Sequence, residues 1–340
     1  MSATPVHDVA TLEQQSTVSR PKNNRRLLLS AGPAVALVVL AVAFAVLTPG
    51  FATVNNARAI VEQASIPLVL AMGSTLVVLL GSVDLSVEGV MAACGLTFVL
   101  LASNNRNDND LGWLAFVIAI GVGAVFGVVN GLIHTRIRVP SFMVTLGTWF
   151  IGLGMATVLF GTTTPQLQDQ TFRAWAGGRW LGVPVVIVFA ALVTVGAFVV
   201  CRYSKLGRYT YAIGGDEAVS RVAGIPVNRF KVIVFCLAGA LSGLGGVLAT
   251  IRLGVGDVSV GSGQLFLTLS AVVLGGTLLS GGRGGPLHTL VGVLILVVLG
   301  NGLLLSGANP YVQQAAQGLV IVIAVIATGW PVRDRLRVVK

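Results

Sequence analysis

Acidic side chains that interrupt apolar sequence are the residues here most able to do chemistry. Asp84 and Glu88 lie in the segment 81–90, where the hydropathy barely falls between two apolar stretches. An aspartate at the centre of a membrane span costs about 2.5–3.5 kcal/mol on insertion scales, so such residues usually face a cavity, an interface or the membrane edge. Two interpretations stay open: a tight turn in which Asp84 caps the next helix, or a broken helix that lines a polar path.

The polar segment 214–230 carries the signals of a short helix at both ends. Asp216 can cap the N-terminus, Gly224 can close the helix, and Pro226 prevents its continuation. We therefore expect a helix of about two turns over 217–223. Its small apolar face would consist of Ala218, Val219, Val222 and Ala223. A helix this short is not stable alone in water, so it needs a partner surface, on this chain or on another protein.

Metal and nucleotide chemistry find little support in the sequence. The three histidines and three cysteines are dispersed without metal-ligand spacing, so we expect no metal site and interpret Cys94, Cys201 and Cys236 as packing residues. The sequence contains no G-x-x-x-x-G-K-[ST] phosphate loop. We expect no cofactor on this chain and no enzymatic activity. If transport is driven by ATP, then ATP and Mg must bind a partner subunit, which could grip the short helix.

Apolar stretches of about 20 residues must position all of these groups. Hydrophobic residues make up 55% of the 340 residues and charged residues 10%, which leaves too little polar surface for a water-soluble globule. A 20-residue helix rises about 30 Å, the thickness of the hydrocarbon core. The sequence thus predicts an all-α polytopic membrane protein with about ten transmembrane helices. The predicted spans are 30–48, 64–82, 85–102, 111–133, 140–161, 183–201, 231–253, 264–280, 286–305 and 312–328.

The positions of the basic residues predict the orientation. With ten spans, 17 of the 22 Lys and Arg residues lie on one side of the membrane. The other five are Arg58, Arg106, Arg173, Arg179 and Arg252. The positive-inside rule makes that side cytoplasmic, with both termini, so the net charge of +10 reflects topology and not nucleic-acid binding. The predicted parts are an N-terminal tail (1–29), a transmembrane domain (30–328) with a long inner loop (202–230), and a basic C-terminal tail (329–340).

A faint internal repeat suggests how the spans are related. Asp84-Leu-Ser-Val is followed by Asn130-Gly-Leu, and Asp257-Val-Ser-Val is followed by Asn301-Gly-Leu at nearly the same spacing. In the ten-span arrangement Asp84 lies inside and Asp257 outside. The two copies would therefore form an inverted repeat, as in many transporters.

Four segments resemble the membrane permease subunits of bacterial ABC importers for ribose and related monosaccharides, including xylose, galactose and arabinose. They are GSVDLSVEGVMA (81–92), VPSFMVTLGTWFIGLG (139–154), YAIGGDEAVSRVAGIPVNRFKV (211–232) and AVVLGGTLLSGGRGGPLHTLVGVLIL (271–296). The similarity runs from about residue 55 to residue 328. The chain departs from the family pattern at Glu88-Gly89, where the family usually has Gly-Ser. If the helix is continuous, Glu88 shares a face with Asp84, and the like charges repel.

The resemblance implies a permease fold, a homodimer in the bacterial inner membrane, an ATP-binding cassette subunit on the inner face and a sugar-binding protein on the outer face. It also implies that residues 216–224 form the coupling helix that inserts into the ATPase. The expected ATPase-coupling residues are Gly215, Asp216, Glu217, Ala218, Val219, Ser220, Arg221, Val222, Ala223 and Gly224. The cargo would be a ribose-like pentose or a hexose.

In this interpretation the sugar crosses between two permease copies and meets polar side chains at membrane depth. The candidates are Asp84, Ser86, Asn130, Phe142, Thr145, Thr148 and Asn301. For Asn130 and Asn301, hydrogen bonding between helices is the simpler explanation; Phe142, Trp149 and Phe150 could instead anchor at the interface. The alternatives are the same machine carrying nucleosides or a signalling sugar, a proton-driven secondary transporter that uses Asp84, Glu88 and Asp257, and a membrane scaffold without transport.

Overall fold

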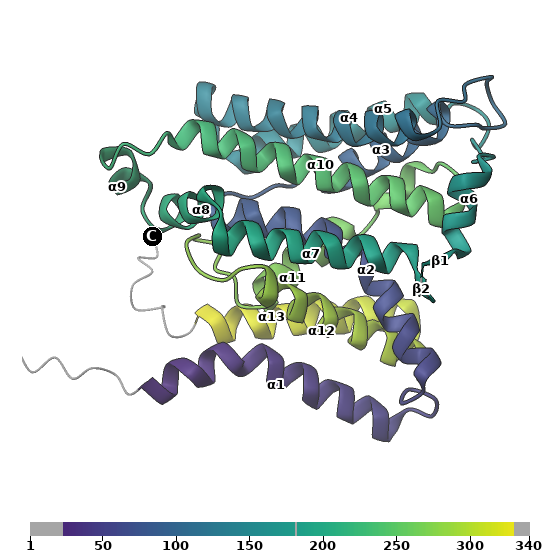
Figure 1. The fold of residues 1–340 in the computed structure, drawn as a ribbon. Helices are drawn as coiled ribbons and strands as arrows, with labels where there is room; N and C mark the ends of the chain where they lie inside the picture. The colour runs from purple at the N-terminus through teal and green to yellow at the C-terminus, as the bar shows by residue number, and fades with distance from the viewer. Residues whose placement is uncertain (1–22, 181, 330–340) are drawn as a thin grey trace, which may run out of the picture.

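The computed structural model describes residues 23–180 and 182–329, and these form a bundle of helices (Figure 1). Six helices are long and apolar enough to cross a membrane, which confirms an all-α polytopic membrane protein. They are α2 (Val54–Leu79), α4 (Trp113–Leu132), α5 (Ser141–Phe160), α7 (Val185–Tyr203), α10 (Val227–Leu253) and α12 (Pro286–Leu305). Each of the ten predicted stretches coincides with a helix, but the count of ten spans stays a prediction.

The other elements are shorter or lie at the ends of the chain. Two flank the bundle, α1 (Asn23–Leu47) and α13 (Pro310–Gly329). Those at the two ends of the bundle are α6 (Gln170–Gly177), the hairpin of β1 (Arg179–Trp180) and β2 (Val183–Pro184), α8 (Lys205–Gly215) and α9 (Glu217–Val222). The remaining elements are α3 (Val87–Leu101), a π-helical turn η3 (Ile133–Ile137), a 3₁₀ turn η4 (Val258–Gly261) and α11 (Gln264–Leu274).

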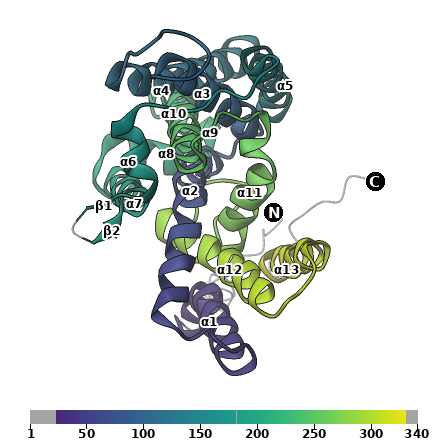
Figure 2. The ribbon, with the colours of Figure 1, turned by 90° about the vertical axis from the view of Figure 1, so that its right-hand side faces the viewer.

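Helix α10 lies at the centre of the bundle and packs against α2, α3 and α4 (Figure 2). Its contact with α4 is a close backbone approach, because a Cβ at Gly123 or Gly127 would overlap carbonyl groups of Gly239 and Phe235. Small residues permit this spacing between membrane helices, where dispersion contacts and backbone proximity replace the hydrophobic effect. The many glycines of the chain are therefore consistent with a packed membrane bundle.

Two of the predicted spans contain helices that are shorter than a membrane crossing. Helix α3 has 15 residues and α11 has 11, so they rise about 22 Å and 16 Å against a core of about 30 Å. Between the end of α2 and the start of α3 the chain forms no regular secondary structure over 82–86. After α11 the chain turns through several glycines with positive φ, including Gly276 and Gly281. A right-handed helix cannot continue through residues with such backbone angles.

Several boundaries differ from the sequence prediction. Helix α1 begins at Asn23, before the predicted start at residue 30, while residues 1–22 and 330–340 of the two predicted tails lie outside the described residues. The loop 202–230 was expected to hold one small helix and holds two, α8 and α9. Helix α8 was missed because its glycines lower helix propensity, although Ser204 caps it by accepting a hydrogen bond from the Gly207 amide.

Candidate functional site

The short helix α9 forms as its end signals predict. The Asp216 carboxylate accepts a hydrogen bond from the Val219 amide at 2.9 Å, and Gly224 adopts φ +79° just after the helix. The helix runs from Glu217 to Val222, one residue shorter than predicted. It lies beside α8 at one end of the bundle, on the left in Figure 1.

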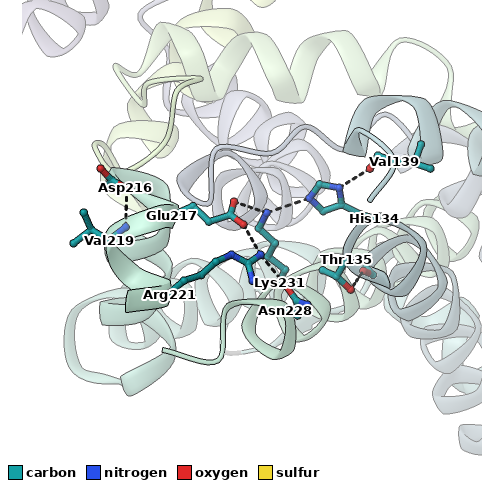
Figure 3. A network of polar contacts seen from close by, with 10 residues as sticks. His134, Thr135, Val139, Asp216, Glu217, Val219, Arg221, Asn228 and Lys231 are labelled. Atoms are coloured by element: carbon teal, nitrogen blue, oxygen red, sulfur yellow. Dashed lines mark hydrogen bonds and ion pairs between the residues drawn. The ribbon is translucent and has the colours of Figure 1, made fainter. Parts of the chain in front are cut away.

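One side of α9 is fixed to the bundle by charge pairs (Figure 3). Glu217 accepts hydrogen bonds from Lys231 Nζ at 2.8 Å and from Arg221 at 2.7 Å. Burial raises the pKa of Glu217, but the hydrogen bonds and charges of Lys231 and Arg221 outweigh it and hold that pKa below its usual value. Lys231 is a buried residue of α10, so the carboxylate ties α9 directly to the central helix.

The network continues from Lys231 to the end of α4. His134 Nδ1 lies 2.8 Å from the carbonyl oxygen of Val139, and His134 Nε2 lies 3.3 Å from Lys231 Nζ. A carbonyl can only accept, so Nδ1 carries the proton and Nε2 accepts from the lysine. A rigid connection thus runs from α9 through α10 to η3, which continues α4.

The opposite side of α9 is an unpartnered apolar surface. Val219 is 63% exposed and Val222 is 91% exposed, while Ser220 on the other side is buried. Ala218 and Ala223 are also exposed. Neighbouring exposed apolar side chains outside the membrane spans are typical of a surface that a partner covers. The predicted apolar face therefore does not lie against the part of the chain that the structure describes.

Helix α8 fastens the same unit to a glycine-rich turn. Tyr211 donates a hydrogen bond to the Gly284 carbonyl at 2.8 Å. Burial, with a smaller contribution from Cys201, raises the pKa of Tyr211 to about 12, so the phenol stays a donor at neutral pH. Gly214 packs so closely on the end of α2 that a Cβ there would overlap the Leu79 carbonyl. A displacement of α8 and α9 would therefore be transmitted to α2, to α10 and to the turn after α11.

Within the bundle, four predicted pathway residues come together around the non-helical segment 82–86. Asp84 Oδ1 accepts from the Ser86 amide at 2.9 Å and from the Ser86 hydroxyl at 2.6 Å. Asn130 Nδ2 donates to Ser86 Oγ at 3.2 Å, and the Thr145 hydroxyl accepts from the Leu85 amide at 3.0 Å. The helical run from α2 to α3 is thus interrupted over 82–86, and Asp84 caps the turn at Ser86 and not the first turn of α3, while a polar path along this segment stays a prediction.

The other predicted pathway residues lie elsewhere. Thr148 donates to carbonyls of its own helix, and Phe142 is 47% exposed on the outer face of α5. Asn301 is buried on α12, which packs against α1, α2 and α11. Both Asn130 and Asn301 nevertheless have a buried side-chain oxygen without a partner among the described residues.

A second polar region lies beside α5, and the sequence analysis did not predict that its residues come together. Glu88, Trp149, Asp257 and Ser259 line a cavity of about 520 Å³ together with Leu153, Phe160 and residues of η4. Glu88 accepts a hydrogen bond from the Leu265 amide at 3.1 Å, at the start of α11. Asp84 precedes α3 and Glu88 lies within it, so the two carboxylates do not share the face of one continuous helix. Trp149 Nε1 is buried without a partner among the described residues.

The geometry combines a broken-helix bundle with a rigidly anchored, outward-facing helix, and the comparisons agree. A family model described as "Branched-chain amino acid transport system / permease component" matches residues 56–325. The chain belongs to this family. The permease is 36% identical over 317 residues to ribose import permease protein RbsC of Escherichia coli (strain K12), which covers 92% of this chain and 97% of that protein.

Two further relatives agree with this assignment. The RbsC protein of Bacillus subtilis (strain 168) is 36% identical over 92% of the permease and 97% of its own length. The L-arabinose transport system permease protein AraH of Escherichia coli (strain K12) is 31% identical over 87% and 89%. These findings confirm the resemblance to monosaccharide permease subunits.

Sequence reasoning missed Lys231, His134 and Ser259. Lys231 had been assigned to the positive side of the membrane, and His134 to a span end, without a role for either. A lysine at the very start of an apolar span was a usable signal, because a charged residue that becomes buried there needs a partner. Ser259 could have been found from the internal repeat, because it follows Asp257 by two positions, as Ser86 follows Asp84.

Proposed function

We propose that this chain is the membrane-spanning permease subunit of an ATP-binding cassette importer that carries a monosaccharide across the bacterial inner membrane. One observation carries the proposal: the exposed apolar face of α9 is held by the Glu217–Lys231–His134 network to the helices of the bundle. A short helix with one anchored side and one bare side is suited to pass a partner's movement into the membrane. Residues 215–224 are its coupling residues.

The nucleotide chemistry belongs to the partner in this proposal. The ATP-binding cassette subunit binds ATP and Mg, and the permease performs no covalent step. ATP binding and hydrolysis shift the permease between inward-facing and outward-facing states, because the partner binds the two states with different affinity. A sugar-binding protein delivers the cargo from outside. Two permease copies form the pathway, in a ten-span topology with both termini in the cytoplasm.

The cargo class rests on the relatives and on the cavity beside α5. The relatives are named for ribose and L-arabinose import. Carboxylates accept hydrogen bonds from sugar hydroxyls, and an indole offers both an apolar ring and an N–H donor. Glu88, Asp257 and Trp149 supply these groups around about 520 Å³. Nucleosides or a signalling sugar would use the same groups.

The same carboxylates give the rival proposal, a proton-coupled secondary transporter. The experiment that separates the two is uptake into proteoliposomes that contain the permease, with and without its ATPase and binding protein. We expect uptake of labelled ribose or L-arabinose only with all three proteins and ATP, and no effect of an uncoupler. Uptake that needs no ATPase and collapses with an uncoupler would contradict the proposal. Labelled nucleosides in the same assay decide the cargo.

A further inference from the structure

A groove of about 690 Å³ lies at the α9 end of the bundle, between the end of α4 and the start of α10. Its lining includes Arg221 of α9 but neither Val219 nor Val222 of the exposed apolar surface. The residues that line it include Thr135, Arg136, Arg221, Asn228 and Arg229. Figure 3 shows three of these residues, Thr135, Arg221 and Asn228, near Lys231.

The groove is strongly basic, and two of its three arginines have no acidic partner among the described residues. Arg221 is paired with Glu217 at 2.7 Å and also contacts Asn228 Oδ1 at 3.0 Å. Arg136 and Arg229 are exposed, and among the described residues neither forms an ion pair or a side-chain hydrogen bond. Glu217 is the nearby carboxylate of the network, and it already accepts from both Arg221 and Lys231. Two guanidinium groups are therefore available to an anion.

One wall of the groove is apolar and continues onto a surface that faces lipid. Leu132, Val232 and Ile233 line the groove. Leu132 is 40% exposed, and further along α4 Val129 and Val125 are exposed in the same way. These side chains belong to helices of span length and hydropathy, so hydrocarbon tails cover them in a membrane. A ligand with an anionic head and an apolar tail matches both walls.

We propose that this groove binds the phosphate headgroup of an anionic phospholipid, with Arg136 and Arg229 as its principal contacts. Guanidinium groups bind phosphate oxygens in pairs of parallel hydrogen bonds, and basic pockets between membrane helices select anionic headgroups. Because Arg221 contacts both the groove and Glu217, an occupied groove also stabilises the inner side of α9. The site does not depend on which sugar is carried.

The test is native mass spectrometry of the detergent-purified permease titrated with phosphatidylglycerol or with phosphatidylcholine of the same chains. The test variant is Arg136→Gln with Arg229→Gln. The matched control is Arg202→Gln with Arg208→Gln, which removes the same charge at the same end of the molecule but outside the groove. Size-exclusion and thermal unfolding verify that each variant is folded, and Arg229→Gln alone replaces the double variant if it is not.

We expect phosphatidylglycerol to bind the test variant about 30-fold more weakly than the wild type, equivalent to about 2 kcal/mol for two charges. The control should match the wild type, and phosphatidylcholine should bind weakly to all three. Equal phosphatidylglycerol affinity of test variant and wild type would overturn the proposal, as would displacement of the lipid by equimolar inorganic phosphate. Loss of ATPase co-purification with lipid binding intact would assign the arginines to a protein partner and also overturn it.

Discussion

Lys231 of α10 donates a hydrogen bond to Glu217 of α9 at 2.8 Å, although 14 positions separate the two residues in the chain. The lysine is buried and the carboxylate is 39% exposed, so the pair joins the interior of the bundle to a surface helix. His134 extends the link to the end of α4. The relationship explains how a helix of six residues keeps one fixed orientation while presenting its apolar face outward.

Substitution of the exposed face should separate docking from folding. Val222→Asp places a charge on a surface that we expect a partner to bury, which is costly without a counter-charge. Co-purification of the ATP-binding cassette subunit should fall at least about tenfold, while membrane insertion and thermal stability stay unchanged. Val222→Leu keeps the surface apolar and is the matched control. Full co-purification with Val222→Asp would show that the partner binds elsewhere.

Removal of the Glu217–Lys231 pair should leave the ATP-binding cassette subunit bound but weaken the coupling of its ATP hydrolysis to sugar import. Lys231→Met leaves the apolar face of α9 intact but deletes the link between α9 and α10. ATPase binding should persist, and the number of sugar molecules imported per ATP hydrolysed should fall. Measured uptake and hydrolysis in the same proteoliposomes give this ratio, and Lys205→Met, an exposed lysine of α8, is the control. An unchanged ratio would mean that the pair does not transmit movement.

The pH dependence of stability should carry the signature of Glu217. Its pKa is below the usual value in the folded protein, so the ionised pair stabilises the fold fully above the usual carboxyl pKa of about 4.3. That stabilisation is lost as the pH falls through the lowered folded-state pKa. Thermal unfolding of wild type and Glu217→Gln should therefore differ at pH 7 and converge in acid. Curves that stay parallel down to pH 3 would contradict the ionised pair.

Backbone proximity between α3 and α5 should make one glycine intolerant of any side chain. A Cβ at Gly89 would overlap the Trp149 carbonyl, whereas Gly147 and Gly154 of α5 have nothing within 4 Å. Gly89→Ala should lower the free energy of unfolding by about 1–3 kcal/mol. Gly147→Ala and Gly154→Ala should leave it nearly unchanged. Equal effects of the three substitutions would argue against the α3–α5 contact.

The parts that the sequence predicts well are those with local causes. The cap of α9 at Asp216 and its end at Gly224 follow from side chains within the segment itself, and apolar length locates the long helices. The network of Glu217, Lys231 and His134 depends on packing between segments up to 97 positions apart, which no local pattern contains. The short helices α3 and α11 were also hidden, because hydropathy does not distinguish a non-helical apolar segment from a continuous helix.

The internal repeat is supported in detail by the two turns. Asp257 accepts from the Ser259 amide at 2.6 Å and from the Ser259 hydroxyl, as Asp84 does from Ser86. Each turn follows a long helix, α2 or α10, and precedes a shorter one, α3 or α11. Leu70 and Gly73 of α2 meet Gly245 and Ala238 of α10, so the two long helices are antiparallel. This is the relation that an inverted repeat requires, although the repeat stays a prediction.

Site-specific crosslinking at position 222 tests the central claim most directly. In a variant with the native cysteines replaced by serine, Val222→Cys should react with a membrane-impermeant thiol reagent only from the cytoplasmic side, and should crosslink to the ATP-binding cassette subunit. Bound partner should protect it from the reagent. Labelling from the outside, or cytoplasmic labelling that the partner neither crosslinks to nor protects, would contradict the account of α9 as the surface through which this permease is driven.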